Sequence, residues 1–228
     1  MYDWGYKPPM KIITTLTLIL ISFNLWAFSS YPSTVPALNI RNSHEINSQV
    51  FRSSQPAKLV QEIVDFNFTD VVIFKNEVKD EVQKQIAFLN AHHVKTHHIA
   101  FPWKDITDPE ATCLQVIEAL KIIKRVQQKG GKVLFHCTAG EDRTGLLAGL
   151  LRMKHEGLSL EEAFSDEMCA KGYADGNPKK PFTVTNPIHA GLTPLFVALA
   201  QKIEAGESLS AASCRGIVLK KTSLRCRK

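Results

Sequence analysis

The sequence predicts an α/β fold in which a largely parallel central sheet is flanked by helices on both faces. Short apolar runs rich in β-branched residues alternate along the chain with longer segments of helical periodicity. The apolar runs are continuous, which is typical of strands that are buried on both faces. At 228 residues the chain is long enough for one substantial domain, with little left for a second.

Four segments are predicted as strands because they are short, apolar and bounded by charged or turn-forming residues. The first begins with "VF" and runs into a turn at "SSQP", and the last, "KVLFHC", ends in a cysteine. The predicted strands are 50–56, 69–75, 94–101 and 132–137.

Six segments have the periodicity of helices. The clearest is 108–131, where Pro109 stands in the first turn, Asp108 or Thr107 supplies the N-cap, and a glycine pair ends the helix. The segment 143–157 is apolar on most faces and is therefore expected at the centre of the molecule. The remaining predicted helices are 57–68, 79–93, 159–172 and 186–206.

The N-terminal segment is predicted to direct export. Lys11 precedes the apolar stretch "IITTLTLILISFNLWAF", and Ala27 offers a small residue at which a signal peptidase could cut. An uncleaved anchor is the main alternative, because the stretch is marginal for a membrane span, and a first core helix is the lesser one. We therefore expect 1–27 to be a signal peptide or anchor, 28–48 a linker or loosely packed arm, and 49–228 the functional domain, in the periplasm or secreted.

All five cysteines (Cys113, Cys137, Cys169, Cys214 and Cys226) follow that cleavage point. An odd number in an exported protein leaves at least one free thiol. Cys214 and Cys226 flank a short C-terminal stretch and could pair. Cys113 and Cys169 fall within helical patterns and are expected to be buried as small hydrophobic residues. Sequence alone leaves the connectivity open.

The formal net charge of +6 favours anionic partners in general but selects no particular one. The sequence contains no basic helix with interleaved aromatics, no zinc-type spacing of Cys and His, and no internal repeat. Nucleic acid is therefore not an expected partner, and a membrane is one only if the N-terminal segment stays uncleaved.

The stretch "VLFHCTAGEDRTGLLAGLL" places polar, reactive residues between a buried strand and a buried helix. The dipole of the helix that begins near Thr144 adds positive charge at the join, and Arg143 can clamp two oxygens with its planar guanidinium. The same field favours the thiolate of Cys137, placed for in-line attack on a bound phosphate. The backbone N–H groups that can surround such an oxyanion belong to Thr138, Ala139, Gly140, Glu141, Asp142 and Arg143.

The residues "HCTAGEDRTG" resemble the signature loop of the cysteine-dependent protein tyrosine phosphatase superfamily. From Val50 to Gly172 the chain is similar to the bacterial dual-specificity-like and phytase-like branch of that superfamily. "VFRSSQP" looks like its early Arg-Ser-x-Gln-Pro element, and "SLEEAFSDEM" like the helix after the catalytic one. The resemblance implies a tyrosine-phosphatase-like fold and hydrolysis of phosphate monoesters through a phospho-cysteine intermediate, with no metal or other cofactor.

The same resemblance implies roles for four residues. Cys137 is the nucleophile, Arg143 the phosphate clamp, and Thr144 the hydroxyl that eases departure of the thiolate. His136 orients the loop and helps to tune the thiolate.

The family's general acid is an Asp from the loop after the preceding strand, and "FPWKDITDPEAT" offers two. Asp108 directly before Pro109 has the arrangement of a helix cap, so Asp105 is favoured.

Asp142, in the signature loop itself, is the third candidate for the general acid, since an Asp directly before the signature Arg has been considered as the acid in bacterial lipid-directed and myotubularin-like phosphatases. Its other expected role is to brace the loop. Many of those loops carry Lys where this chain has Glu141, which is expected to repel polyphosphorylated rings.

Two substrate classes remain open: phosphotyrosine and phosphoserine/threonine in proteins, and inositol polyphosphates. A basic rim would favour the polyanion, and Lys104, Lys179, Lys180 or the tail "LKKTSLRCRK" could supply one, although each is also an ordinary surface residue. The alternative functions are a non-catalytic phosphate-binding module and an arsenate or sulfur-transfer enzyme on a related cysteine loop. A pure binder needs no thiol, and the complete spacing to Arg-Thr disfavours the other chemistry.

Four histidines in "AHHVKTHH" (His92, His93, His97 and His98) suggest a metal site at first sight. The first two end a predicted helix and the last two occupy the next strand, where adjacent residues face opposite sides. A shared metal site is therefore not expected.

Overall fold

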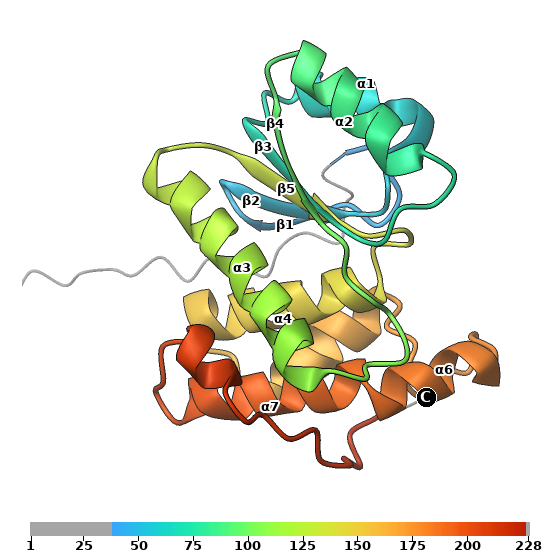
Figure 1. Cartoon of the computed structure of the whole chain (residues 1–228), viewed down its shortest axis with the longest axis vertical. Coiled ribbons are helices and arrows are strands. Elements are labelled where there is room, and N and C mark those ends of the chain that lie inside the picture. The colour runs from blue at the N-terminus through green and yellow to red at the C-terminus, as the bar shows by residue number, and fades with distance from the viewer. Residues whose placement is uncertain (1–37, 227–228) are drawn as a thin grey trace, which may run out of the picture. The chain divides into compact units, whose positions relative to one another are not determined.

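The computed structural model describes residues 38–226, and these contain a five-stranded sheet in the order β1-β2-β5-β3-β4 (Figure 1). Strands β2, β5, β3 and β4 run parallel to one another, and β1 pairs antiparallel with β2. The predicted α/β architecture is confirmed. The strands are β1 (His44–Asn47), β2 (Val50–Ser53), β3 (Asp70–Phe74), β4 (Lys95–Ile99) and β5 (Val133–His136).

Helices cover both faces of the sheet (Figure 1). On one face α1 (Val60–Asp65) and α2 (Glu81–Ala91) bury residues such as Ile63 and Leu89 against Val71 and Leu134 of the strands. On the other face α3 (Pro109–Gln128) and α4 (Asp142–Glu156) pack on the opposite side chains of the same strands. The continuous apolar strands are thus explained, because successive side chains enter two different cores.

Helix α4 lies at the centre of the second layer, as its sequence predicts. All residues from Arg143 to Met153 are buried, because α4 lies between the sheet and α7 (Leu192–Glu204). Gly149 allows this approach: a Cβ there would meet the Phe196 ring at 2.9 Å. The strand before α4 and the helix itself therefore hold the intervening loop from both ends.

Three predicted helices differ in detail. Segment 57–68 is a 3-10 turn (η1, Ala57–Leu59) followed by α1. Segment 186–206 is two helices, α6 (Phe182–Ala190) and α7, which meet at Gly191 against the Ile106 side chain. Segment 159–172 begins as α5 (Leu160–Glu162), which Ser159 and Glu162 cap reciprocally, then widens into a π-helix and closes in a 3-10 turn. These last two elements are η2 (Ala163–Met168) and η3 (Cys169–Lys171).

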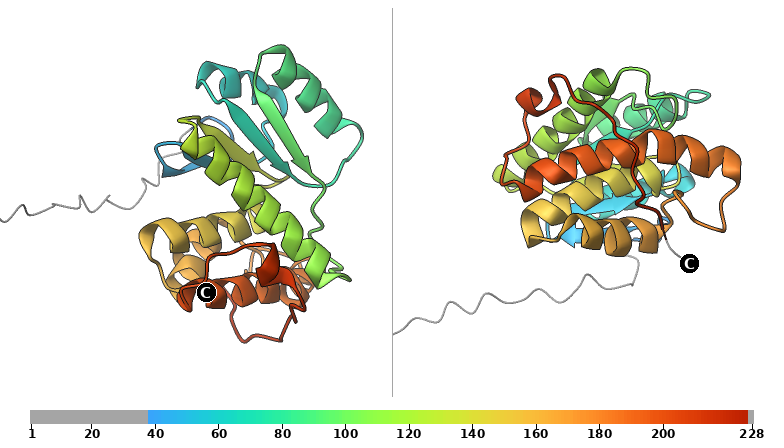
Figure 2. Two further views of the ribbon diagram at one scale, coloured as in Figure 1. Left: turned by 60° about the vertical axis from the view of Figure 1, so that its left-hand side comes forward. Right: turned by 90° about the horizontal axis from the view of Figure 1, so that it is seen from below.

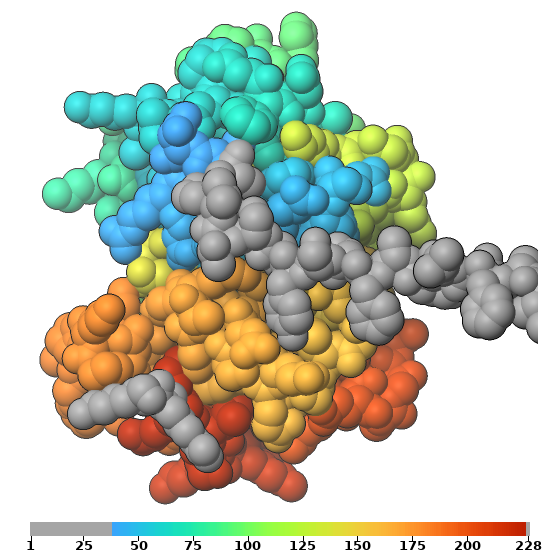
Figure 3. All heavy atoms as spheres, turned by 180° about the vertical axis from the view of Figure 1, so that it is seen from behind, coloured from blue at the N-terminus to red at the C-terminus, as the bar shows by residue number. Residues whose placement is uncertain are grey.

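The described part of the predicted linker is folded and packs on the domain, in contrast to the loose arm that its composition suggested. Residues 44–47 form β1, and the side chains of Leu38, Ile40 and Ile46 are buried. Ser, Asn and Pro along this segment suggested a loose arm, but its few apolar residues are spaced to reach the two cores. Figure 3 shows this blue segment adjoining yellow and light orange parts that are distant in sequence.

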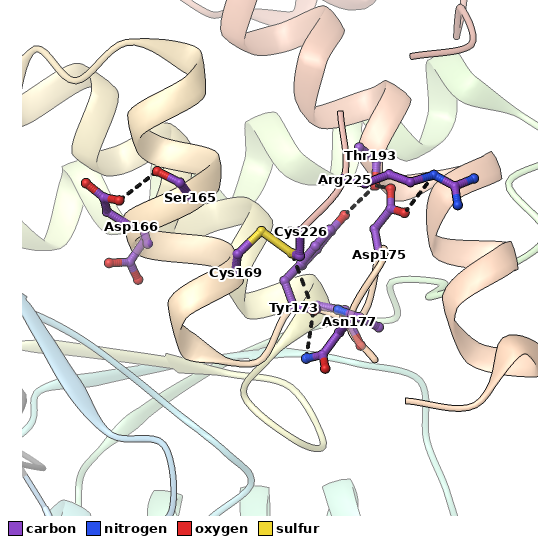
Figure 4. The surroundings of a disulfide bond; sticks show 12 residues. Ser165, Asp166, Cys169, Tyr173, Asp175, Asn177, Thr193, Arg225 and Cys226 are labelled. Atoms are coloured by element: carbon purple, nitrogen blue, oxygen red, sulfur yellow. Dashed lines mark hydrogen bonds and ion pairs between the residues drawn. A yellow bond between two sulfur atoms is a disulfide. The ribbon is translucent and has the colours of Figure 1, made fainter. Parts of the chain in front are cut away.

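Two disulfides join the C-terminal part to the helical layer, and both contradict the sequence-based expectation. Cys113 on α3 pairs with Cys214 of η4 (Ala211–Cys214), and Cys169 of η3 pairs with Cys226 (Figure 4). The final stretch, dark red in Figure 2, crosses the outside of the helices and so brings its cysteines to partners 101 and 57 residues away. In the loop-entropy account, bridges over such distances stabilise by about 3–5 kcal/mol each.

The predicted signal peptide or anchor (1–27), and the linker as far as residue 37, lie outside the described residues. Within residues 38–226 no helix is both long enough and apolar enough to span a membrane.

Candidate active site

The sequence-predicted loop lies at the carboxyl end of β5, the central strand of the sheet, and leads directly into α4. Cys137 follows the last residue of the strand, and its side chain is almost fully buried, with 2% of the residue exposed. All five cysteines lie among the described residues, and Cys137 is the one outside a disulfide. The predicted free thiol is therefore the one at the signature loop.

Hydrogen bonds hold the loop carbonyls on its outer side. The Thr138 carbonyl accepts from the Gln55 N–H at 3.1 Å, and the Gly140 carbonyl accepts from Asn42 Nδ2 at 2.7 Å. The described peptide bonds are all trans, so the N–H of each such peptide points opposite to its carbonyl. The N–H groups of Ala139 and Glu141 are consequently turned toward the inside of the loop.

These amides have no partner within the protein. Among residues 38–226, the N–H groups from Thr138 to Glu141, which we term the amide cradle, donate to no protein acceptor. Thr138 is exposed and Ala139 half-buried, so this side of the cradle is open to a ligand or to water, whereas Gly140 and Glu141 are buried. Buried backbone amides without a partner are rare unless something else at the site completes them. Gly140 makes the tight turn possible, since its φ is +72° and a Cβ would meet the Ser54 nitrogen at 2.5 Å. The cradle suits a tetrahedral oxyanion.

Arg143 lies beside the cradle as predicted. Its Nη2 donates to Thr138 Oγ1 and its Nη1 to the Phe101 carbonyl, both at 3.1 Å. The second bond connects the signature loop to the segment after β4, which carries the candidate acids. The guanidinium is thereby held in place at the site, and it can exchange the hydroxyl for a phosphate oxygen.

His136 is neutral and fully buried. Its Nε2 accepts from Gln85 Nε2 at 2.8 Å, so its proton is on Nδ1, which donates to the Cys137 carbonyl at 3.1 Å. Burial lowers the pKa of His136 to about 4. The side chain therefore supports the loop through hydrogen bonds rather than through positive charge.

The hydroxyl of Thr144 is fully buried and has no hydrogen-bond partner among the described residues. Such a group carries a desolvation cost unless something else at the site bonds to it. The implied role, donation to the departing thiolate, stays a prediction, but the hydroxyl is available for it.

The carboxylate of Glu141, in the signature loop, is paired with two cations. Glu141 forms ion pairs with Arg41, at 3.1 Å, and with Lys180, and only 8% of the residue is exposed. The repulsion of polyphosphorylated rings expected from Glu141 stays a prediction, and the two ion pairs argue against it because they offset the charge of the carboxylate. The acidic residue instead places two cations next to the signature loop.

Asp142 is largely buried beside the cradle. Its Oδ1 accepts from the Ala174 N–H at 2.8 Å, which joins the signature loop to the segment after η3. Burial raises the pKa of Asp142 to about 6, against the lowering effect of that hydrogen bond. The hydrogen bond is the bracing role predicted for Asp142, and the raised pKa keeps the acid role possible near pH 6.

The two aspartates of the preceding loop have separate positions. Asp108 caps α3, with its Oδ1 accepting from the Ala111 N–H at 2.9 Å, as predicted. Asp105 is exposed (75% of the side chain), has a left-handed φ of +54°, and has only Lys104, at 4.0 Å, as an ionic partner among the described residues. Asp105 is thus accessible, and among residues 38–226 no hydrogen bond or ion pair joins its side chain to the signature loop. Lys104 is half-exposed and lies 5.4 Å over the Trp103 ring.

The four histidines are not brought together. His97 pairs with Asp70 at 2.7 Å, while the His98 Nε2 lies 2.9 Å from the Lys75 carbonyl and the His92 Nδ1 2.8 Å from the Phe88 carbonyl. Within residues 38–226 no group of three or more metal-ligating side chains is close enough to hold an ion.

Sequence reasoning predicted no supporting role for three residues that hold the loop: Arg52, which it quoted only as part of the Arg-Ser-x-Gln-Pro element, Gln85 and Asn42. A signal existed for two of them. Gln85 occupies the same helical face as Val82 and Leu89, where an apolar residue would be expected, and Arg52 interrupts a strand that is otherwise fit for burial. A polar residue at a buried position requires a partner, but the sequence does not identify that partner.

Solved structures support the fold. Tk-PTP in its active form is 25% identical, with a TM-score of 0.52, covering 71% of this chain and 97% of that one. The core catalytic domain of the PP-IP phosphatase SIW14 from S. cerevisiae, solved with citrate, is 21% identical with a TM-score of 0.50 and covers 75% and 96%. The second similarity concerns the fold alone.

Sequence comparison points the same way. A tyrosine-protein phosphatase of Nostoc commune is 46% identical over 52 residues, which is 23% of this chain and 17% of that relative. The family model described as "Dual specificity phosphatase, catalytic domain" matches residues 50–166, more than half of the 228 residues, and includes the whole signature loop. The chain therefore belongs to the dual specificity phosphatase family and carries the catalytic domain of a cysteine-dependent phosphatase.

Proposed function

We propose that this protein hydrolyses phosphate monoesters in two steps through a phospho-cysteine intermediate. The observation that carries the proposal is one free thiol at the base of an amide cradle with no internal partners, beside a fixed arginine. A binding module would need the cradle and the arginine but not the thiol, and no observation favours arsenate or sulfur transfer.

In the first step the Cys137 thiolate attacks phosphorus and the ester P–O bond breaks, while a carboxylic acid, with Asp105 favoured, protonates the leaving oxygen. In the second step water attacks phosphorus, the S–P bond breaks, and the carboxylate accepts a proton from that water. Inorganic phosphate leaves and the thiolate is restored. The amide cradle and Arg143 stabilise the charge on the equatorial oxygens in both steps.

Phosphotyrosine is the substrate class we favour. Because Cys137 is only 2% exposed, we expect the phosphate to reach below the surface of the loop, and a phosphotyrosine side chain projects further than a phosphoserine. Inositol polyphosphates are the second candidate, which the exposed side chains of Arg41 and Lys104 beside the loops support.

A substrate panel tests the function. Initial rates are measured on an aryl phosphate, a phosphotyrosine peptide, a phosphoserine peptide and inositol hexakisphosphate, each with and without a chelator. We expect hydrolysis that the chelator leaves unchanged and that mild oxidation abolishes, because the thiolate is the reagent. Loss of activity with chelator and recovery with a divalent ion would contradict the proposal. The ratio of tyrosine to inositol substrate decides between the two classes.

We also propose that the protein is exported, as its N-terminal sequence predicts. Two disulfides among the described residues support this, since such bonds persist in oxidising compartments. N-terminal sequencing of the protein from the native cell should find a chain that begins near Phe28, in the periplasm or the medium. A soluble cytoplasmic chain that retains residues 1–27 would contradict export.

A further inference from the structure

A fully buried arginine lies under the signature loop. Arg52 is part of β2, all four residues of which are buried, and β2 is the direct neighbour of β5. Its Nη1 donates to the carboxylate of Glu167, on η2, at 2.5 Å. Burial would raise the pKa of Glu167, but Arg52 and Lys171 keep it below its usual value, so the carboxylate is ionised. A cation at such a position is tolerated because this counter-ion accompanies it.

The other arm of the same guanidinium is bound to the signature loop. Arg52 Nη2 donates to the Gly140 carbonyl. Asn42 Nδ2 donates to the same carbonyl, at 2.7 Å. The peptide between Gly140 and Glu141 is trans, so pulling its carbonyl toward Arg52 turns the Glu141 N–H the opposite way, into the cradle.

We infer that Arg52 is a positioning residue for phosphate binding: its fork, fixed by Glu167, orients the Gly140–Glu141 peptide so that the Glu141 N–H faces the bound oxyanion. The inference rests on the proposed function only for the identity of the ligand. Arg52 does not touch the substrate. A lysine could neutralise Glu167 but could not hold both acceptors with a planar fork.

Binding of inorganic phosphate to the Cys137→Ser protein, measured by calorimetry, tests this without any turnover. Adding Arg52→Met should weaken phosphate binding about ten- to a hundredfold, because the Glu141 N–H would no longer be held in the direction of the phosphate. Arg152→Met is the matched control. Arg152 is also buried and also donates to Glu167, at 3.4 Å, but its other bond goes to Glu156 rather than to the loop. The control should lose thermal stability to a similar extent and bind phosphate within about twofold of its parent.

Two further variants keep the test decisive if Arg52→Met does not fold. Arg52→Lys should bind phosphate with intermediate affinity. Asn42→Gly removes the second donor to the Gly140 carbonyl and suits the left-handed φ of +54° at that position, so it should weaken binding a few-fold. Equal phosphate affinity in the Arg52 variants and in the Arg152 control would overturn the inference. Absence of hydrolysis by the parent enzyme with normal phosphate binding would instead count against the proposed function.

Discussion

Replacement of Cys137 by serine is expected to reduce hydrolysis of an aryl phosphate by about 10⁵-fold or more, because the nucleophile of the first step is lost. The amide cradle and Arg143 do not depend on the thiol, so inorganic phosphate should still bind within a few-fold of its affinity for the parent enzyme. Initial rates and calorimetry measure the two quantities separately.

Thiol titration of the unfolded, unreduced chain provides the control. The parent should show one thiol per chain and Cys137→Ser none, because the other four cysteines are bridged. Turnover by the serine variant comparable to that of the parent would disprove the assignment of the nucleophile.

Asp105→Asn is expected to slow hydrolysis of an alkyl phosphate about 10²–10⁴-fold and that of an activated aryl phosphate much less, because only a poor leaving group needs the proton. Asn is also well tolerated at positive φ, so the loop backbone at Asp105 should be kept. The basic limb of the pH–rate profile should disappear as well, since it reports ionisation of the acid.

Two matched variants accompany that measurement. Asp108→Asn should be nearly silent, because Asn caps a helix about as well as Asp. Asp142→Asn should keep the bond from the Ala174 N–H and should reduce phosphate affinity more than it changes leaving-group dependence. Burial raises the pKa of Asp142 to about 6, so its own ionisation can also affect the pH profile. Leaving-group dependence is therefore the deciding measurement: if Asp142→Asn, instead of Asp105→Asn, slows the alkyl phosphate far more than the activated aryl phosphate, the acid lies in the signature loop.

The sequence allowed β2 to β5, the central helix and the signature loop to be predicted because each depends on local pattern, whereas β1 lies in the segment predicted to be a linker. Val133 to Leu151 reads as strand, anion loop and buried helix within a single stretch, and the structure has them in that order. The Asp108 cap is equally local. In each case the residues that determine the structure lie within a few positions of one another.

What could not be predicted depends on distant partners. Cys113 and Cys169 have the same helical context as any small buried residue, and only the path of the tail brings Cys214 and Cys226 to them. Arg52 and Glu167 are 115 residues apart, so neither indicates the other in the sequence. Glu141 was expected to repel polyphosphorylated rings because nothing near it in the sequence indicates its cationic partners, Arg41 and Lys180, which lie 100 and 39 residues away.

The arrangement of the five cysteines has a consequence for how active protein is made. Five thiols can be joined into two disulfides and one free thiol in roughly fifteen ways, three pairings for each choice of the unpaired residue. The pattern seen here spares the nucleophile and ties the tail to the helical layer at two points. A chain that collapses first hides Cys137 at the end of β5 before oxidant reaches it, whereas a chain that oxidises first can trap it in a bridge. We therefore expect the yield of active protein to depend on whether Cys137 is buried before the cysteines are oxidised.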